Sequence, residues 1–348
     1  MIDKDESFMK RCFQLATTGM GGVAPNPMVG AVIVHDGRII GEGWHRQWGG
    51  PHAEVNAVAS VLDKSLLCNS TIYVSLEPCS HYGKTPPCAK LLVDCGFPRV
   101  VVANMDPFPL VSGRGVQMLR DSGAVVETGL LEAEGWELNR RFFTFHTKHR
   151  PYVILKWAQT ANGFMASAGG GRLFISNPVS SVLVHKLRAE EAAILVGTNT
   201  AMLDNPKLTV RDYSGKNPVR VLIDRRLCVP DSFNIYNDEA KTIVFTEADS
   251  CNMHVGDNVH FVCAPFDSNG VDLNFVMETL YNTNLQSLIV EGGASLLNSF
   301  VRDGFVDECR VETNLSLSVA DGLRAPQPVG RVVSTEMVSG NMIQKFRS

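Results

Sequence analysis

Hydrophobic and polar positions in the first 145 residues alternate between helical and strand spacing. Residues 7–17 place apolar side chains at helical spacing, and residues 31–35 form an apolar run rich in β-branched residues. Asp36 and Gly37 form a hairpin signal, so residues 38–43 are expected to return as a second strand. The other expected elements are helices from Pro51, from Pro87 and over 115–122, and strands over 71–76, 99–104 and 125–126. Repeated strand–helix units predict a sheet with helices on its faces.

The pattern changes at residues 139–150, where arginine, lysine and histidine cluster. We expect this segment to be a polar connection between two domains. The alternation then restarts and predicts a second α/β domain, with a helix over 179–189 and strands over 151–158, 193–196, 219–223, 242–245, 288–290 and 309–313. The sequence therefore predicts an α/β protein with domains at 1–145 and 146–348.

Composition and net charge say more about which partners the chain can bind than about its fold. The chain has 348 residues, 45% of them hydrophobic and 20% charged, which is ordinary for a globular protein. Lys and Arg number 32 and Asp and Glu 36, so the net charge is −4. Without a basic excess to displace counterions, general binding of nucleic acid is not expected. Small anionic substrates remain compatible, because they need only a few local positive charges.

The N-terminus and the cysteines favour a cytoplasmic protein. The first ten residues carry acids and lack an apolar core segment, unlike a signal peptide. No apolar run approaches the ~20 residues of a membrane span. Nine cysteines spread over a long chain argue against a disulfide scaffold. Seven of them match no motif and are expected to be structural thiols: Cys12, Cys68, Cys95, Cys228, Cys251, Cys263 and Cys309.

Three short segments of the first domain carry a pattern of metal ligands. A catalytic zinc takes three protein ligands and leaves one position for water, and His52, Cys79 and Cys88 supply one nitrogen and two thiolates. Zinc lowers the pKa of its bound water towards neutrality, and Glu54 would carry the released proton to a leaving amine. Cys88 is also expected at a helix N-terminus, which favours a thiolate. We therefore expect a zinc-dependent hydrolytic site.

The order His-x-Glu followed by Pro-Cys is the signature of zinc deaminases, although eight residues separate Cys79 from Cys88 instead of two. Two other zinc proteins fit part of the pattern. A structural site usually has four protein ligands and would leave Glu54 without a role. A deaminase of tRNA or single-stranded DNA would share the motif, but the net charge of −4 and the long inter-cysteine segment argue against it.

The long inter-cysteine segment resembles one particular family. Residues 25–30, 41–43, 51–54, 77–88, 106–107 and 111–115 are similar to the deaminase half of the bifunctional RibD family of riboflavin biosynthesis. This resemblance covers about residues 7–145 and implies a cytidine-deaminase-like domain of three α/β/α layers. It also implies substrate contacts from four residues of this chain: Asn26, His45, His81 and Lys84.

The second domain carries a weaker signal of its own. Two glycines, Gly292 and Gly293, stand between an apolar strand and a helical pattern, where backbone N–H groups can approach a phosphate. The family resemblance continues over residues 151–156, 187–189, 197–200, 204–211, 220–224, 291–294 and 306–308. It implies a dihydrofolate-reductase-like α/β domain that uses NADPH.

The resemblance also implies a set of reductase-site residues. Three match the positions that line the reaction centre: Lys156, Asp204 and Glu291. Five match positions that bind the substrate, the arginines 188 and 211 holding its phosphate: Arg172, Arg188, Leu208, Arg211 and Glu291. Six fall where the family contacts NADPH: Ala158, Phe174, Thr200, Asp204, Arg225 and Gly293.

Departures from the family pattern concentrate in this second half. Asn162 stands where the family has an aspartate, while Arg172 and Phe174 replace a Ser-x-Trp pattern. Arg225 replaces a small serine close to where the 2′-phosphate of NADPH would lie. These changes leave an alternative open, in which only the deaminase is active and the reductase-like domain serves assembly.

The favoured interpretation is a bifunctional enzyme of riboflavin biosynthesis. Its first domain would remove the 2-amino group of 2,5-diamino-6-(5-phosphoribosylamino)pyrimidin-4(3H)-one by zinc-dependent hydrolysis. Its second domain would use NADPH to reduce the ribosyl group, giving 5-amino-6-(5-phosphoribitylamino)uracil. The expected partners are this small phosphorylated pyrimidine, Zn²⁺, NADPH and, by the family resemblance, further copies of the chain joined through the reductase domain. Neither nucleic acid nor a membrane is expected.

Overall fold

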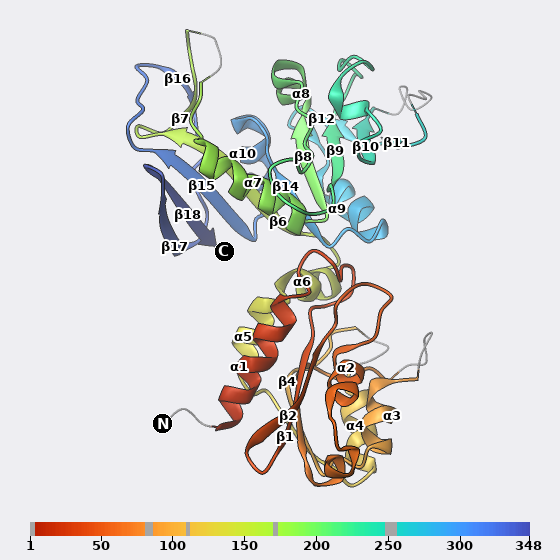
Figure 1. Ribbon diagram of the computed structural model, residues 1–348. Coiled ribbons are helices and arrows are strands. Elements are labelled where there is room, and N and C mark those ends of the chain that lie inside the picture. Colours follow the sequence, from red (N-terminus) through yellow and green to blue (C-terminus); the bar gives the residue numbers. More distant parts are fainter. Residues whose placement is uncertain (1–3, 81–85, 109–111, 170–172, 248–255) are drawn as a thin grey trace. The chain divides into compact units, whose positions relative to one another are not determined.

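The computed structural model describes residues 4–80, 86–108, 112–169, 173–247 and 256–348. The chain divides into two compact units, Met1–Lys148 and His149–Ser348, and each is described by itself (Figure 1). His81, Lys84 and Arg172, three of the expected site residues, lie outside the described residues.

The first unit is built on a five-stranded sheet in the order β2-β1-β3-β4-β5. Strand β1 pairs antiparallel with β2 and β3, whereas β3, β4 and β5 run parallel. The strands are β1 (Gly30–His35), β2 (Arg38–Trp44), β3 (Thr71–Leu76), β4 (Arg99–Asn104) and β5 (Val125–Thr128). Each corresponds to a strand expected from the sequence.

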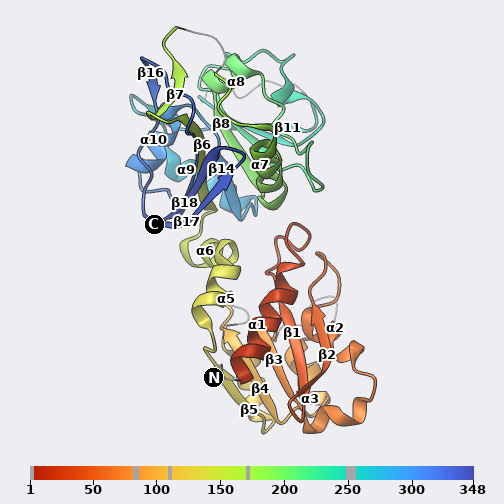
Figure 2. The same ribbon diagram turned by 60° about the vertical axis from the view of Figure 1, so that its left-hand side comes forward.

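Helices cover both faces of this sheet because successive strand residues point to opposite sides. Ala31 and Ile33 of β1 pack with α2 (Ala53–Ser60), α3 (Cys88–Asp94) and α4 (Arg114–Asp121). Val32 and Val34 pack on the other side with α1 (Lys4–Thr17), where α5 (Glu132–Leu138) also lies (Figures 1 and 2). The result is the expected arrangement of three α/β/α layers. A 3₁₀ helix, η1 (Lys64–Asn69), leads into β3.

The expected polar connection at 139–150 is wrong. Most of this segment forms α6 (Arg140–Lys148), in which Phe142, Phe143 and Phe145 are buried. The phenylalanines give the helix an apolar face, and the cationic residues that dominate the sequence occupy its other positions. The expected boundary between residues 145 and 146 therefore falls inside a helix.

The second unit is built on a nine-stranded sheet in the order β11-β10-β9-β8-β14-β6-β15-β18-β17. In this spatial order, all strands from β11 at one edge through β15 run parallel. Strands β18 and β17 follow as antiparallel additions at the other edge. The strands are β6 (Tyr152–Thr160), β8 (Ala193–Gly197), β9 (Val219–Ile223), β10 (Thr242–Thr246), β11 (Val259–Cys263), β14 (Ser287–Val290), β15 (Glu308–Asn314), β17 (Arg331–Val338) and β18 (Asn341–Arg347).

Two apolar layers cover the faces of this second sheet. Helices α7 (Pro178–Glu190) and α8 (Thr198–Asp204) pack on one face, and α9 (Leu273–Asn282) and α10 (Ala294–Arg302) pack on the other. Smaller elements are β7 (Phe164–Ser167), which pairs with β16 (Gly322–Arg324), the hairpin β12 (Phe266–Asp267) and β13 (Gly270–Val271), and η2 (Asn234–Tyr236).

Two further expectations can be compared with the structure. Cys263 is disulfide-bonded, so the expectation of a structural thiol is wrong at this position. Cys12, Cys68, Cys95, Cys228 and Cys309 are free thiols. Across the described residues, no helix combines the length and the apolar character needed to cross a bilayer.

Candidate active sites

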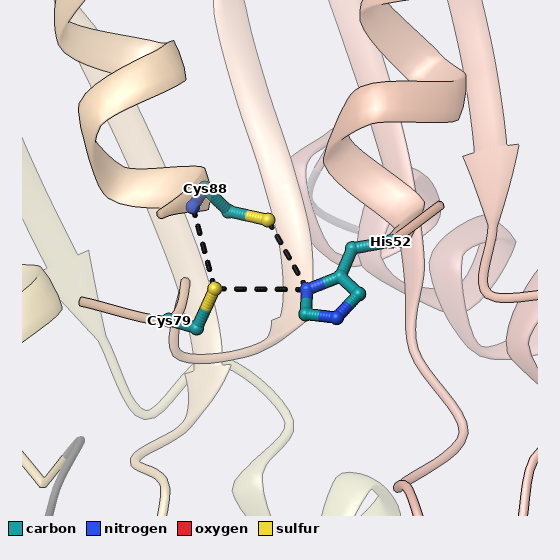
Figure 3. A group of neighbouring side chains, drawn as sticks. All are labelled: His52, Cys79 and Cys88. Carbon is teal, nitrogen blue, oxygen red and sulfur yellow. Dashed lines mark hydrogen bonds between the residues drawn. The ribbon is translucent and has the colours of Figure 1, made fainter. Parts of the chain in front are cut away.

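His52, Cys79 and Cys88 converge in the first unit (Figure 3). His52 directly precedes α2, Cys88 is the first residue of α3, and Cys79 lies three residues after the end of β3. His52 Nδ1 lies 3.6 Å from Cys79 Sγ and 3.3 Å from Cys88 Sγ. All three ligand atoms lie within 4.8 Å of one another. Two helix starts and one strand end therefore bring together residues up to 36 positions apart.

The two thiols differ in how readily they ionise. The hydrogen bond from Cys88 lowers the pKa of the Cys79 thiol to about 4, and His52 and the Cys88 backbone N–H also lower this pKa. The same hydrogen bond holds the pKa of the Cys88 thiol above its usual range. Without metal, Cys79 is therefore the thiolate of the pair. The sequence had instead pointed to Cys88, because Cys88 lies at a helix N-terminus. The hydrogen bond that Cys79 accepts from Cys88 therefore affects the two thiol pKa values more than the helix N-terminus at Cys88 does.

These donors fit a zinc ion. One imidazole nitrogen and two sulfurs are the ligands that zinc prefers, and three protein ligands leave a fourth position for a reactant. The stable Cys79 thiolate already supplies negative charge to a cation there. A disulfide between Cys79 and Cys88 would compete with metal binding, but both residues are free thiols.

Glu54 lies in the first turn of α2, beside this ligand set. Its side chain is 3% exposed and shares a hydrogen bond with Cys88. Burial and, to a smaller extent, the charge of Cys79 together raise the pKa of Glu54 to about 7. A carboxyl with a pKa near neutrality can both take up and release a proton during a reaction.

His45 lies next to His52, and Asn26 lies next to His45. The His45 ring lies edge-on to the His52 ring, with centroids 5.4 Å apart. His45 Nδ1 is 3.0 Å from the Pro51 carbonyl, so this nitrogen carries the proton. Its Nε2 therefore accepts from Asn26 Nδ2 at 3.1 Å, which leaves the Asn26 carbonyl oxygen for another partner. Burial lowers the pKa of His45, consistent with a neutral ring.

Glu77 has a part in this site that the sequence motif did not reveal. Its carboxylate is 4% exposed and accepts backbone N–H groups from Asp106, Gly113, Gly115 and Val116 at 3.0–3.3 Å. These contacts fix the segment just before Cys79 to the start of α4. The motif contains Glu77, but the groups that it binds lie 29–39 residues away in sequence.

The second unit brings together Lys156, Arg188 and Glu291 from β6, α7 and the end of β14. Arg188 Nη2 donates to Glu291 Oε2 at 2.7 Å. Against the cost of burial, the charges of Arg188 and Lys156 lower the pKa of Glu291. Glu291 Oε1 and Arg188 Nε are buried without a hydrogen-bond partner among the described residues. Unpaired buried polar atoms are costly, so these two atoms suggest that a ligand completes the cluster.

Other expected reductase residues lie at the carboxyl ends of neighbouring parallel strands, where ligands bind in open α/β sheets. Thr200 lies in the first turn of α8, which directly follows β8, and its Oγ1 accepts the Gly293 N–H at 3.1 Å. Arg225 follows β9, pairs with Glu247 at 2.5 Å and lies over the Phe266 ring. Ala158 is on β6, the other neighbour of β14. This strand edge, with its glycines at a helix start, fits a phosphate-bearing cofactor.

The remaining expected residues are less clearly part of one site. Asp204 ends α8 and is exposed, and Phe174 is 76% exposed. The Leu208 side chain is buried in the core, so it is not available to a ligand. Asn162, a departure from the family pattern, accepts from Thr160 Oγ1 and donates to the carbonyl of Val319, 157 residues away.

Comparison with known sequences agrees with this division of the chain. Residues 2–104 match the family described as cytidine and deoxycytidylate deaminase zinc-binding region. Residues 151–314 match the RibD C-terminal domain. The riboflavin biosynthesis protein RibD of Aquifex aeolicus is 42% identical over 87% of this chain and 85% of its own length. RibD of Bacillus amyloliquefaciens is 37% identical over 99% and 90%, respectively.

Solved structures extend the similarity to both units. A diaminohydroxyphosphoribosylaminopyrimidine deaminase/5-amino-6-(5-phosphoribosylamino)uracil reductase from Thermotoga maritima superposes with a TM-score of 0.88 at 36% identity, covering 99% of this chain and 98% of that chain. RibD of Acinetobacter baumannii gives a TM-score of 0.89 at 31% identity, with the same coverage. The chain therefore belongs to the RibD family of riboflavin biosynthesis proteins, and it joins a zinc-binding deaminase unit to a reductase unit.

Proposed function

We propose that the two units catalyse successive steps on one phosphorylated pyrimidine, with residues 1–148 as the deaminase and 149–348 as the reductase. The first step hydrolyses the 2-amino group of 2,5-diamino-6-(5-phosphoribosylamino)pyrimidin-4(3H)-one and releases ammonia. The second reduces the ribosyl group at C1′ and opens its ring to a ribityl chain. The observation that carries the proposal is the convergence of His52, Cys79 and Cys88 on one point beside the buried Glu54.

In the deaminase, the protein binds the base and moves the proton. Zinc, when bound, acts as a Lewis acid that activates water for attack on the ring carbon. Glu54 takes a proton from the attacking water and delivers it to the departing amine, as its pKa of about 7 allows. Asn26, oriented by His45, presents its carbonyl oxygen to an N–H of the pyrimidine. His81 and Lys84 belong to the same proposed substrate set.

In the reductase, charged residues hold the substrate at the carboxyl edge of the sheet. NADPH, when bound, supplies the hydride. Arg188 and Arg211 bind the substrate phosphate, for which a guanidinium offers paired donors. Glu291 accepts a sugar hydroxyl with its unpaired oxygen, and Lys156, beside it, donates a proton to the ring oxygen as the ring opens. Arg172 completes the proposed substrate contacts. The proposed cofactor contacts are Ala158, Phe174, Thr200, Asp204, Arg225 and Gly293, with Asp204 also at the reaction centre.

The alternative of an inactive reductase unit rests on Asn162, Arg172 and Phe174. The Asn162 side chain bonds Thr160 and both the carbonyl and the N–H of Val319, so a structural role in joining these two segments explains its place. The cluster of Lys156, Arg188 and Glu291 retains its full set of charges and two unpaired buried atoms. These observations favour an active reductase.

One assay tests both halves. Purified, zinc-loaded protein is given the pyrimidine phosphate, and ammonia release and NADPH absorbance are followed together, with and without NADPH. We expect ammonia without NADPH, and loss of NADPH absorbance once the cofactor is added. Ammonia without any NADPH loss would instead support the deaminase-only alternative, and no ammonia would contradict the assignment of the zinc site.

We also propose that the chain acts in the cytoplasm as a homo-oligomer joined through the reductase unit. Apolar side chains exposed on this unit support the pairing. They include Val179, Val182 and Leu183 on α7 and Val332, Val333 and Met337 on β17. Sedimentation of the intact chain tests it, and a monomer at micromolar concentration would contradict it.

A further inference from the structure

His185 is a buried histidine of the reductase unit that the proposed reaction does not use. It lies on α7, one helical turn before Arg188, and its side chain is 3% exposed. Two groups bind its ring. The backbone N–H of Arg211 donates to Nδ1 at 3.1 Å, and Nε2 lies 3.3 Å from a carboxylate oxygen of Asp212. Both ring nitrogens therefore bind the segment that carries Arg211.

These contacts fix the tautomer of His185. Because the Arg211 N–H donates to it, Nδ1 carries no proton, and the single proton of the neutral ring lies on Nε2, facing Asp212. Protonation of Nδ1 would set two N–H groups against each other. Burial, with the charges of Arg188 and Arg211, lowers the pKa of His185 and so opposes the cation.

The segment that His185 holds is anchored on both sides of Arg211, by Leu208 in the core and by Asn217, whose Nδ2 donates to the Glu239 carbonyl at 2.9 Å. It joins α8 to β9 without regular secondary structure over residues 205–218. Its tip is exposed, and Asn217 Oδ1 accepts the neighbouring Val210 N–H at 2.8 Å. Both guanidinium groups reach Thr209: Arg188 Nη1 is 3.4 Å from its carbonyl and Arg211 Nη1 is 3.4 Å from its hydroxyl. Arg211 thus comes beside Arg188 only while this segment keeps its place.

We propose that His185 is a positioning residue for phosphate binding: by accepting the Arg211 backbone N–H, it holds the Arg211 guanidinium beside that of Arg188. This inference rests on the proposed function, in which these two arginines bind the substrate phosphate. A neutral histidine serves this purpose because it supplies an acceptor without adding a third positive charge between two arginines.

Reductase kinetics of the full chain test the inference with two variants. His185→Leu fills the space without an acceptor, whereas His185→Asn keeps an oxygen that can accept the same N–H. Loss of this hydrogen bond is expected to raise KM for the phosphorylated pyrimidine about tenfold in His185→Leu, with kcat and KM for NADPH unchanged. His185→Asn should recover most of this loss. His260→Leu, an exposed position on β11, is the matched control and should behave as wild type.

Inhibition by inorganic phosphate distinguishes a loss of phosphate binding from a general destabilisation of the reductase unit. As a competitor of the pyrimidine, phosphate should inhibit His185→Leu more weakly, by the same factor as the rise in KM. An equal KM in His185→Leu and wild type, equal defects in the Leu and Asn variants, or a parallel rise in KM for NADPH would each overturn the inference. Arg188→Gln distinguishes a failure of the His185 inference from a failure of the proposed function. If this variant leaves phosphate inhibition unchanged, the proposed phosphate site itself is wrong.

A measurement on the unaltered protein keeps the inference testable if His185→Leu does not fold. In the full chain labelled with ¹⁵N-histidine, His185 should be the neutral tautomer protonated on Nε2 at pH 7.5, and added inorganic phosphate should shift its resonances. A cationic ring, a ring protonated on Nδ1, or resonances insensitive to phosphate would overturn the inference.

Discussion

At the residue scale, the candidate deaminase site contains two buried carboxyls, for which proton transfer (Glu54) and positioning (Glu77) are the proposed roles. Glu54 and Glu77 are both nearly fully buried, yet they differ in their surroundings. Glu77 accepts four backbone N–H groups, which satisfy its charge. Glu54 lies beside the Cys79 thiolate, and burial raises its pKa to about 7. Glu54 is therefore suited to exchange a proton near neutral pH.

Replacing Glu54 tests this assignment. Glu54→Gln keeps the shape of the side chain and removes the group that takes up the proton. We expect ammonia release to fall by about 10²–10⁴-fold, the range for loss of a general acid–base group, with zinc content and fold unchanged. Steady-state ammonia release and metal analysis check this result. Glu134→Gln, an exposed position on α5, is the control. Turnover near that of wild type would exclude Glu54 from proton transfer.

Asp5 offers a residue-scale prediction about acid stability. The hydrogen bond from Arg99 holds the pKa of Asp5 below its usual value near 3.8, against the cost of burial, and Tyr73 also donates to it. A lowered pKa stabilises the fold above the unfolded-state value, and this contribution is lost as pH falls through the folded-state value. Asp5→Asn should therefore cost about 1 kcal/mol at pH 7, since the pair is partly exposed, and less below pH ~4.

Amide hydrogen exchange of β3, whose Tyr73 binds Asp5, measures this difference locally. The gap between wild type and Asp5→Asn should stay constant from pH 7 to about 5 and narrow below pH ~4, as the pH falls from the unfolded-state pKa through the lowered folded-state pKa. Asp121→Asn, at an exposed position that ends α4, is the control and should show no such trend. A gap that stays constant with pH would mean that the Asp5 charge contributes nothing.

At the scale of elements, close packing of β2 against α2 sets the position of two site residues. A Cβ at Gly43 would lie 2.2 Å from Ala57 N and 2.5 Å from Ala53 O, both in the backbone of α2. Backbone atoms cannot move aside as a flexible side chain can, so any larger residue displaces the helix. Helix α2 begins at His52 and carries Glu54 in its first turn.

Gly43→Ala should therefore affect both stability and metal binding. We expect a destabilisation of about 1–3 kcal/mol, typical of overpacking, together with weaker zinc binding because His52 moves away from the two cysteines. Thermal unfolding and zinc titration with a competing chelator measure the two effects. Gly169→Ala is the control, since a Cβ there would meet only Ser167 Oγ, at 3.8 Å. Lower stability with unchanged zinc affinity would show that the helix position does not limit the site.

The convergence of the three candidate zinc ligands could be predicted from the sequence because the information is local. His52, Cys79 and Cys88 each lie at an expected helix start or strand end, and a short motif records all three. The cluster of Lys156, Arg188 and Glu291 comes from three separate elements, and no spacing in the sequence encodes its geometry. The same holds for His185, whose partners Arg211 and Asp212 lie on an irregular segment. For these residues the family resemblance, or the structure, was needed.

The errors at the element scale also have physical causes. Over residues 139–150, four arginine and lysine residues outnumber three phenylalanines, so composition suggested a polar connection. The buried face of Phe142, Phe143 and Phe145 depends on helical geometry, which composition does not show. The hairpin of β17 and β18 was not predicted because most of β17 is exposed, and its polar and apolar residues do not alternate with burial.

At the scale of the whole molecule, the two activities should be separable. The proposed zinc ligands all belong to the first unit, whose apolar clusters contain only residues of that unit. The reductase unit has two large clusters of its own on the faces of its sheet. Each unit therefore has the buried apolar core that a domain needs to stay folded on its own.

Removing the metal tests this separation in the intact chain. With a strong chelator present, ammonia release should stop because the ring carbon is no longer attacked, whereas NADPH oxidation should continue when the deaminated pyrimidine is supplied. The rate of the second reaction should stay within about twofold of its value with zinc, since no proposed reductase residue binds the metal. Restoring zinc should recover ammonia release. If both activities instead fell together and recovered together, the reductase site would depend on the folding or placement of the deaminase unit.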